Sequence, residues 1–100
     1  MNEISIKDFL KINKEDTQII DIRECYEHEN GNIGSINIPM DQILESTNKI
    51  QKDKKVIIYC QTGRRAAAVV YMLKKKFNIS NVFNLMGGYA AYMDITENTS

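Results

Sequence analysis

The segment of this chain with the clearest chemical potential is a short loop around a cysteine, Cys60-Gln61-Thr62-Gly63-Arg64-Arg65. A loop that precedes a helix directs several backbone N–H groups toward one point, and the helix dipole adds positive potential there. Gly63 allows the tight turn, and Arg64 and Arg65 add fixed positive charge. Such surroundings favour the thiolate, which is the nucleophilic form of cysteine. The sequence therefore predicts that Cys60 is a catalytic nucleophile and that Gln61, Thr62, Gly63, Arg64 and Arg65 bind its substrate.

The spacing within this loop limits the group that it can hold. Four residues separate Cys60 from Arg65, whereas cysteine phosphatases place five residues between cysteine and arginine. The residue at the phosphatase position is Ala66, and the loop contains no acidic residue that could act on a leaving alcohol. The smaller ring of amides is expected to suit one additional sulfur atom on Cys60, a persulfide. A cysteine-based phosphatase or arsenate reductase is the less favoured alternative.

Short apolar runs alternate with helical patterns along the chain, and these predict the elements that position the loop. The pattern predicts strands that begin at Ile4 and span Ile19–Ile22, Ile36–Ile38, Val56–Tyr59 and Val82–Leu85. It predicts helices over Lys7–Ile12, Glu24–Glu29, Asp41–Ile50 and Tyr89–Met93, with a longer helix from Arg64. This alternation predicts an α/β fold whose mostly parallel central sheet of about five strands has helices on both faces. Ligands of such sheets bind at the carboxyl ends of the strands, where Cys60 follows Tyr59.

The long helix from Arg64 has an apolar face at steps of three and four residues. Ala66, Val69, Val70, Leu73 and Phe77 form that face. The pattern indicates that this helix packs on the sheet and that Asn78 ends it in a left-handed conformation.

In four blocks the sequence resembles the single-domain rhodaneses, a family of thiosulfate sulfurtransferases. The blocks are Ile19-Ile20-Asp21-Ile22-Arg23-Glu24, Gly31-Asn32-Ile33 with Gly34-Ser35-Ile36-Asn37-Ile38-Pro39, the loop Cys60–Arg65, and Leu85-Met86-Gly87-Gly88-Tyr89-Ala90-Ala91-Tyr92. They follow the order of the family and span residues 19–92. The resemblance implies one rhodanese-like domain over residues 1–95, and the polar composition of residues 96–100 predicts a frayed tail.

The resemblance also implies a double displacement that needs no metal or organic cofactor. Thiosulfate or a similar sulfane-sulfur donor would load Cys60, and a small thiol, cyanide or a protein thiol would accept the sulfur. The amides of Gln61 to Arg65 would stabilise the persulfide, and Arg64 and Arg65 would attract the anionic donor. The alternative function is a sulfur carrier or protein-binding module without turnover.

Four features depart from the family pattern. Asn32 stands where a histidine is usual, one residue is missing between Ile33 and Gly34, and Tyr92 replaces a tryptophan. These three are expected to affect structure more than chemistry. Gln61 replaces the arginine of many members, which removes one positive charge and leaves the choice of donor open.

Other reactive or charged residues follow the second predicted strand. Cys25 could attack a Cys60 persulfide, although a helix residue without a role is the favoured interpretation. His28 lies between two glutamates and is expected to be solvated. Asp21 and Arg23 are expected to brace the neighbouring loops through hydrogen bonds rather than to act in catalysis.

Composition excludes several classes of protein. The chain of 100 residues is 43% hydrophobic and 26% charged, which is typical of one globular domain. No apolar run reaches the roughly 18 residues of a membrane-spanning helix, and the amino-terminal segment lacks the apolar stretch of a signal peptide. We therefore expect a cytoplasmic protein that does not bind a membrane.

The net charge and the spacing of cysteine and histidine argue against two further classes, nucleic-acid binders and metal-binding proteins. Thirteen basic and thirteen acidic residues balance, which argues against a nucleic-acid binder. The balance hides an asymmetry, because residues 1–50 carry 5 basic and 10 acidic side chains and residues 51–100 carry 8 and 3. Two cysteines and one histidine lack the spacing of a metal site, so no metal is expected.

Overall fold

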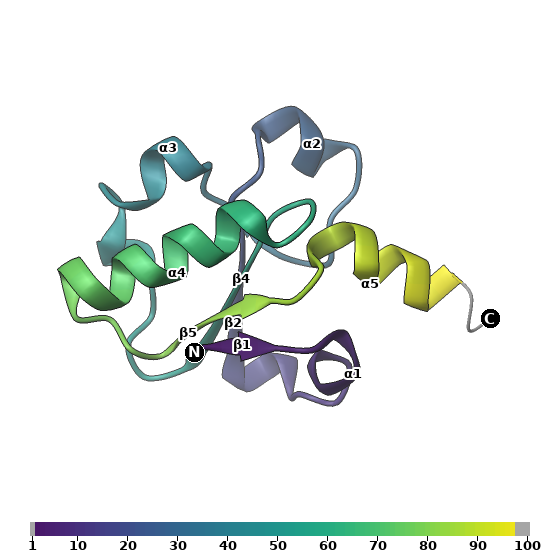
Figure 1. Ribbon diagram of the computed structural model, residues 1–100, viewed down its shortest axis with the longest axis horizontal. Coiled ribbons are helices and arrows are strands. Elements are labelled where there is room, and N and C mark those ends of the chain that lie inside the picture. The colour runs from purple at the N-terminus through teal and green to yellow at the C-terminus, as the bar shows by residue number, and fades with distance from the viewer. Residues whose placement is uncertain (1, 98–100) are drawn as a thin grey trace.

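Five parallel strands form the centre of the fold in the computed structural model, which describes residues 2–97 (Figure 1). The strands are β1 (Glu3–Ile4), β2 (Thr17–Asp21), β3 (Ile36–Asn37), β4 (Lys55–Tyr59) and β5 (Val82–Leu85). Their order across the sheet is β1-β5-β4-β2-β3, and every neighbouring pair is parallel. The predicted α/β fold with a parallel sheet of five strands is confirmed.

Helices cover both faces of this sheet, as the sequence predicted. The α-helices are α1 (Ile6–Phe9), α2 (Cys25–Glu29), α3 (Met40–Ile43), α4 (Arg64–Phe77) and α5 (Gly88–Glu97), and two 3-10 turns span Lys14–Asp16 and Thr47–Lys49. On one face, α3 and α4 pack their apolar side chains on β2, β4 and β5. On the other face, α1 and α5 pack against the opposite side of the same strands.

The central strand β4 is buried on both faces, which explains its continuous apolar sequence. Val56, Ile57, Ile58 and Tyr59 have no exposed surface. Val56 and Ile58 belong to the core under α4, whereas Ile57 and Tyr59 belong to the core under α1 and α5. The strand is thereby fixed from both sides, and so is the position at which Cys60 leaves the sheet.

Two of the predicted helical features are wrong. The helix expected over Asp41–Ile50 ends at Ile43, and a separate 3-10 turn follows at Thr47–Lys49. Ser46 lies between the two elements, and Thr47 and Asn48 follow it in the turn; the side chains of such residues compete with helical hydrogen bonds. Phe77 was expected on the buried face of α4, but it is 40% exposed. It lies in the last turn of α4, beyond the sheet, and Ile79 is buried there instead.

The ends of the other helices differ less from expectation. Asn78 ends α4 in the predicted left-handed conformation, with φ of 55°. The amino-terminal helix is shorter than the predicted Lys7–Ile12, whereas α5 continues to Glu97 and so includes the first two residues of the predicted tail 96–100. The remaining residues of that tail, 98–100, lie outside the described part of the chain.

Within residues 2–97, no helix is long and apolar enough to cross a membrane. In the same range, no group of three or more histidine, cysteine or acidic side chains is arranged to hold a metal ion.

Candidate functional site

The loop between β4 and α4 wraps around the sulfur of Cys60. The Gly63 N–H donates a hydrogen bond to Cys60 Sγ at 3.0 Å, and the Ala66 N–H approaches the same sulfur at 3.4 Å. Gly63 adopts the left-handed conformation, with φ of 95°, which turns the chain sharply into α4. The sulfur therefore lies at the amino-terminal end of a helix of 14 residues, where the helix dipole favours negative charge.

The amides that contact the sulfur only partly match the predicted set. Gly63 belongs to the predicted stretch Gln61–Arg65, whereas Ala66 lies one residue beyond it. Cys60 has no solvent-exposed surface in this conformation. The most exposed parts of the loop are Thr62 and Arg64.

The start of α5 holds this loop from the side opposite to α4. The Tyr89 N–H donates to the Cys60 carbonyl at 2.8 Å, and the Ala90 N–H donates to the Gln61 carbonyl at 3.0 Å. The approach requires glycine, because a Cβ on Gly88 would overlap the Cys60 carbonyl oxygen and the Gln61 backbone. Figure 1 shows the loop between α4 and the first turn of α5. The sequence analysis missed this contact, although two adjacent glycines were a signal of close backbone approach.

Arg23 lies beneath the loop and joins it to β2. The Arg23 residue is 2% exposed. Its guanidinium forms an ion pair with Asp21, in which Arg23 Nη2 lies 2.8 Å from Asp21 Oδ2. Its Nη1 donates to Gln61 Oε1 at 3.3 Å, and its Nη2 donates to the Gly31 carbonyl at 2.6 Å. The ring of Tyr89 lies 4.3 Å from the guanidinium carbon, within range of a cation–π interaction. Asp21 and Arg23 thus form the brace that the sequence predicted, and Arg23 makes the direct contact with the loop.

Asp21 is charged although it is fully buried. Burial raises the pKa of its carboxyl group, but hydrogen bonds from Arg23 and His28 outweigh burial and leave this pKa below its ordinary value. Burial lowers the pKa of Arg23, but pairing with Asp21 outweighs burial, so this pKa is raised.

The expectation that His28 is solvated is wrong. Its Nδ1 lies 3.0 Å from Asp21 Oδ2, and its side chain is 19% exposed.

Two arginines begin α4, and they have different surroundings. Arg64 is exposed, whereas the Nη1 of Arg65 lies 3.4 Å from Glu27 Oε1 on α2. Burial raises the pKa of the Glu27 carboxyl group. Hydrogen bonds from the Glu24 amide and from Arg65 lower this pKa by more than burial raises it, so the net shift is downward. The structure therefore places Arg65 in a link between α4 and α2, and leaves Arg64 open to an anion from solvent.

Cys25 is the first residue of α2 and is exposed. Its Sγ lies 3.6 Å from Glu29 Oε1. The charge of Glu29, with smaller effects of desolvation and a hydrogen bond, raises the pKa of this thiol. Cys25 is therefore a poor nucleophile near neutral pH.

Residues that depart from the family pattern have structural contacts. The Asn32 Oδ1 accepts a hydrogen bond from the Gly34 N–H at 2.9 Å, which closes the turn before β3. Tyr92 packs its ring edge-on against Phe9, with centroids 6.1 Å apart. Both observations agree with the expectation that these departures affect structure more than chemistry.

Comparison with known proteins assigns this arrangement to a family. The model of the rhodanese-like domain matches residues 6–94. The uncharacterised protein YqhL of Bacillus subtilis is 40% identical over 73 residues, which cover 72% of this chain and 57% of YqhL. The adenylyltransferase and sulfurtransferase UBA4 of Saccharomyces cerevisiae is 28% identical, and the match covers 96% of this chain and 26% of UBA4. The chain thus spans only part of the length of these relatives.

A solved structure supports the same assignment over nearly the whole chain. The rhodanese-related protein of Thermoplasma volcanium superposes with a TM-score of 0.85 at 29% identity. The match covers 95% of this chain and 93% of that protein. With the family model, the loop around Cys60 and this superposition in agreement, the chain belongs to the rhodanese-like domain family and is related to sulfurtransferases and sulfur carriers.

Proposed function

We propose that this chain is a thiosulfate sulfurtransferase that carries sulfur as a persulfide on Cys60. The observation that carries the proposal is the pair of hydrogen bonds that the Gly63 and Ala66 amides direct at Cys60 Sγ. Amides aimed at one atom, together with the dipole of α4, stabilise negative charge on that atom without any reorganisation during the reaction. A thiolate and a persulfide anion carry their charge on this sulfur or on the one attached to it.

The reaction is a double displacement in which atoms and electrons balance. The Cys60 thiolate attacks the outer sulfur of thiosulfate, the S–S bond of thiosulfate breaks, and sulfite leaves with the electron pair. An acceptor thiolate or cyanide then attacks the terminal sulfur of the Cys60 persulfide. The new bond forms on the acceptor, and Cys60 is released as a thiolate. Arg64, at the exposed start of α4, is placed to attract the anionic donor.

The residues around the loop would act by holding its backbone. Tyr89 and Ala90 fix the Cys60 and Gln61 carbonyls, and Arg23 fixes the Gln61 side chain. A rigid loop keeps its amides directed at the sulfur through both displacements. In this proposal Gln61 is a positioning residue that Arg23 anchors, and the amides of Gly63 and Ala66 are the groups that stabilise charge.

Intact-mass measurement after incubation with thiosulfate tests this function. We expect one added sulfur atom on the wild-type chain and on Cys25→Ser, and none on Cys60→Ser. Absence of the adduct on the wild type, or an equal adduct on Cys60→Ser, would contradict the proposal. Steady-state thiocyanate formation from thiosulfate and cyanide then separates an enzyme from a carrier. Loading without turnover would assign the chain to the carrier alternative, and hydrolysis of p-nitrophenyl phosphate would support a phosphatase instead.

A further inference from the structure

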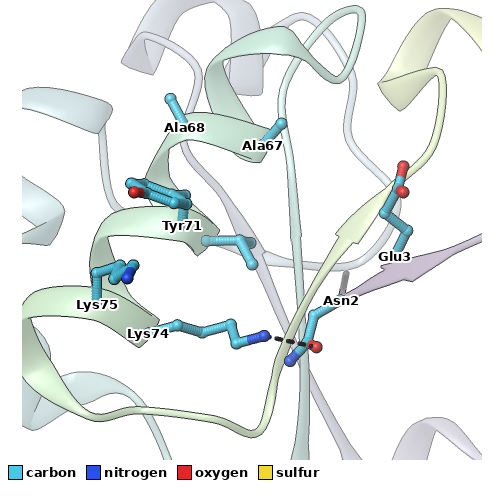
Figure 2. A pocket seen from close by; sticks show the side chains of 8 residues that line it. Asn2, Glu3, Ala67, Ala68, Tyr71, Lys74 and Lys75 are labelled. Carbon is cyan, nitrogen blue, oxygen red and sulfur yellow. Dashed lines mark hydrogen bonds between the residues drawn. The ribbon is translucent and has the colours of Figure 1, made fainter.

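A groove of about 530 Å³ lies between α4 and the edge strand β1, away from the loop of Cys60 (Figure 2). One wall is an apolar stretch of α4 that includes Ala67, Ala68 and Tyr71. Glu3 lies on the opposite wall, and Lys75 lies near the far end of the groove. Tyr71 is 60% exposed, so its ring is available to a bound segment.

The groove results from how the sheet ends beneath α4. Ala66, Val69 and Leu73 bury one side of the helix, whereas Ala67, Ala68 and Tyr71 on the adjacent side are exposed. The carbonyls of Asn2 and Ile4 accept hydrogen bonds from the Asn84 amide of β5 and from the Met86 amide just after it, each at 2.9 Å. Because these groups alternate along a strand, the N–H and C=O of Glu3 point toward the open edge of the sheet. An extended peptide can therefore lie beside β1 with alternate side chains in the groove.

The charges around the groove indicate which peptide fits. Lys74 and Lys75 stand on the α4 wall, and the ammonium of Lys74 donates to Asn2 Oδ1 at 3.0 Å (Figure 2). Two lysines against the single carboxylate of Glu3 leave this groove positive. An occupant with apolar side chains facing Ala67, Ala68 and Tyr71 and with acidic side chains facing the lysines complements both features.

The α4 wall of the groove begins at Ala67, one helical turn after the Cys60 loop. The Ala67 N–H donates to the Gly63 carbonyl at 3.0 Å, so one turn of helix both supports the Cys60 loop and begins the groove wall. At a rise of about 1.5 Å per residue, Ala68 lies roughly 6 Å along the axis from Arg64, and Lys75 roughly 16 Å. A segment of about five extended residues therefore spans the groove and leaves its end near the loop.

We propose that this groove docks an extended, acidic and apolar segment of a protein that exchanges sulfur with Cys60. The identity of that partner as a sulfur donor or acceptor rests on the proposed function. The groove itself does not depend on the proposed chemistry. Binding and transfer are therefore tested separately.

The binding test uses a fluorescent peptide that alternates leucine with glutamate and ends in cysteine, with fluorescence anisotropy as the readout on the Cys60→Ser chain. Tyr71→Ser is expected to weaken binding roughly tenfold, and Lys75→Glu roughly threefold to tenfold. The matched controls are Tyr26→Ser, an exposed tyrosine on α2, and Lys76→Glu, the neighbouring lysine outside the groove. Both controls should bind like the parent chain. A peptide with lysine in place of glutamate should bind more weakly.

Three results would overturn docking in this groove: no binding of the acidic peptide, equal binding by Tyr71→Ser and the parent, or equal loss in Lys75→Glu and Lys76→Glu. A dimer in light scattering that Tyr71→Ser abolishes would assign the groove to a second copy of the chain and overturn the proposal.

The transfer test loads wild-type Cys60 with thiosulfate. Sulfur should move to the peptide cysteine faster than to dithiothreitol, and Tyr71→Ser should slow only the peptide reaction.

The two tests fail in different ways. If thiosulfate does not load Cys60, the proposed function fails, whereas the anisotropy result still decides whether the groove binds an acidic segment. If Cys60 is loaded and Tyr71→Ser slows both acceptors equally, the groove has no part in acceptor recognition.

Discussion

Cys60 and Cys25 both follow the carboxyl ends of neighbouring parallel strands, β4 and β2, and both lie at the start of a helix. Their sulfur atoms nevertheless meet opposite surroundings. Cys60 Sγ is buried and accepts hydrogen bonds from two backbone amides. Cys25 Sγ is exposed and lies beside the Glu29 carboxylate, which raises the pKa of the thiol. The groups that contact each sulfur, and not its position at a strand end, therefore distinguish the two thiols.

The difference begins in the two loops that precede the helices. The left-handed Gly63 turns the chain so that the amides at the start of α4 point back at Cys60. At the start of α2, the Glu24 N–H is occupied by the Glu27 carboxylate, and the cysteine is inside the helix rather than before it. A helix of 5 residues also has a weaker dipole than one of 14. Both sequences place a cysteine near a helix start, but only the first gives it amide donors.

The largest expected effect concerns the ion pair that lies between the two cysteine regions. Asp21→Asn leaves the buried Arg23 without its carboxylate, which should lower the free energy of unfolding by about 3–5 kcal/mol at neutral pH. The pKa of Asp21 is lower in the folded state than in the unfolded chain, so its contribution is full above about pH 4 and is lost as pH falls further. The difference in unfolding free energy between wild type and Asp21→Asn should therefore shrink below pH 4. Urea denaturation at several pH values measures it, and a pH-independent difference would contradict the assignment.

The next prediction removes the support that Cys60 has and Cys25 lacks. Gly88→Ala places a methyl group against the Cys60 carbonyl and the Gln61 backbone, which must displace the loop. Sulfur transfer should fall roughly a hundredfold, because a displacement of about 1 Å in a site can have an effect of that size. Thiocyanate formation from thiosulfate and cyanide provides the measurement.

Gly34→Ala is the matched control for this change. Gly34 also has positive φ, at 80°, but no atom lies within 4 Å of the Cβ position. Both variants introduce the strain of a left-handed alanine, and only Gly88→Ala disturbs the Cys60 loop. Equal losses of activity in the two variants would show that backbone strain alone is responsible.

A third prediction removes the negative charge that lies beside Cys25 and not beside Cys60. Glu29→Gln removes the charge that raises the pKa of the Cys25 thiol, so more thiolate is present at mildly alkaline pH. Alkylation of Cys25 by iodoacetamide should accelerate modestly, while alkylation of Cys60 stays unchanged. Peptide mapping by mass spectrometry distinguishes the two sites. If the rate at Cys25 does not change, Glu29 is not the group that suppresses its reactivity.

Local sequence predicted the fold, because the strands and α4 depend on short-range patterns, and it placed the Cys60 turn between β4 and α4. The β-branched run Val56–Tyr59, the apolar stripe of α4 and the glycine at position 63 each encode a backbone shape. Contacts between distant segments were not visible in the same way. The approach of Tyr89 to the Cys60 carbonyl spans 29 positions, and the contact of His28 with Asp21 depends on how α2 folds over β2. Side-chain identity alone did not distinguish a solvated histidine from one that binds a buried carboxylate.

The exposed position of Phe77 shows the limit of a prediction from helical periodicity. Helical periodicity shows which residues share a face, but it does not show where the sheet beneath that face ends. The apolar stripe of α4 continues to Phe77, whereas the core under it stops at Leu73 and Ile79. The groove beside Tyr71 likewise depends on how α4 lies relative to β1, which only the packed structure shows.

The smallest expected effect concerns the link between the two cysteine regions at the surface. Arg65 and Glu27 join α4 to α2 across 3.4 Å, with side chains 36% and 21% exposed. A partly exposed pair of this kind contributes no more than about 1 kcal/mol, so Glu27→Gln should lower the free energy of unfolding by less than that amount.

Glu27→Gln should nevertheless release Arg65 as a cation beside the Cys60 loop. The KM for thiosulfate should therefore fall while kcat stays constant. Arg65→Gln in the same assay should raise the KM if Arg65 attracts the donor. If neither variant changes the KM, Arg65 serves only to hold α2 against α4, and attraction of the anion is left to Arg64 and the loop amides.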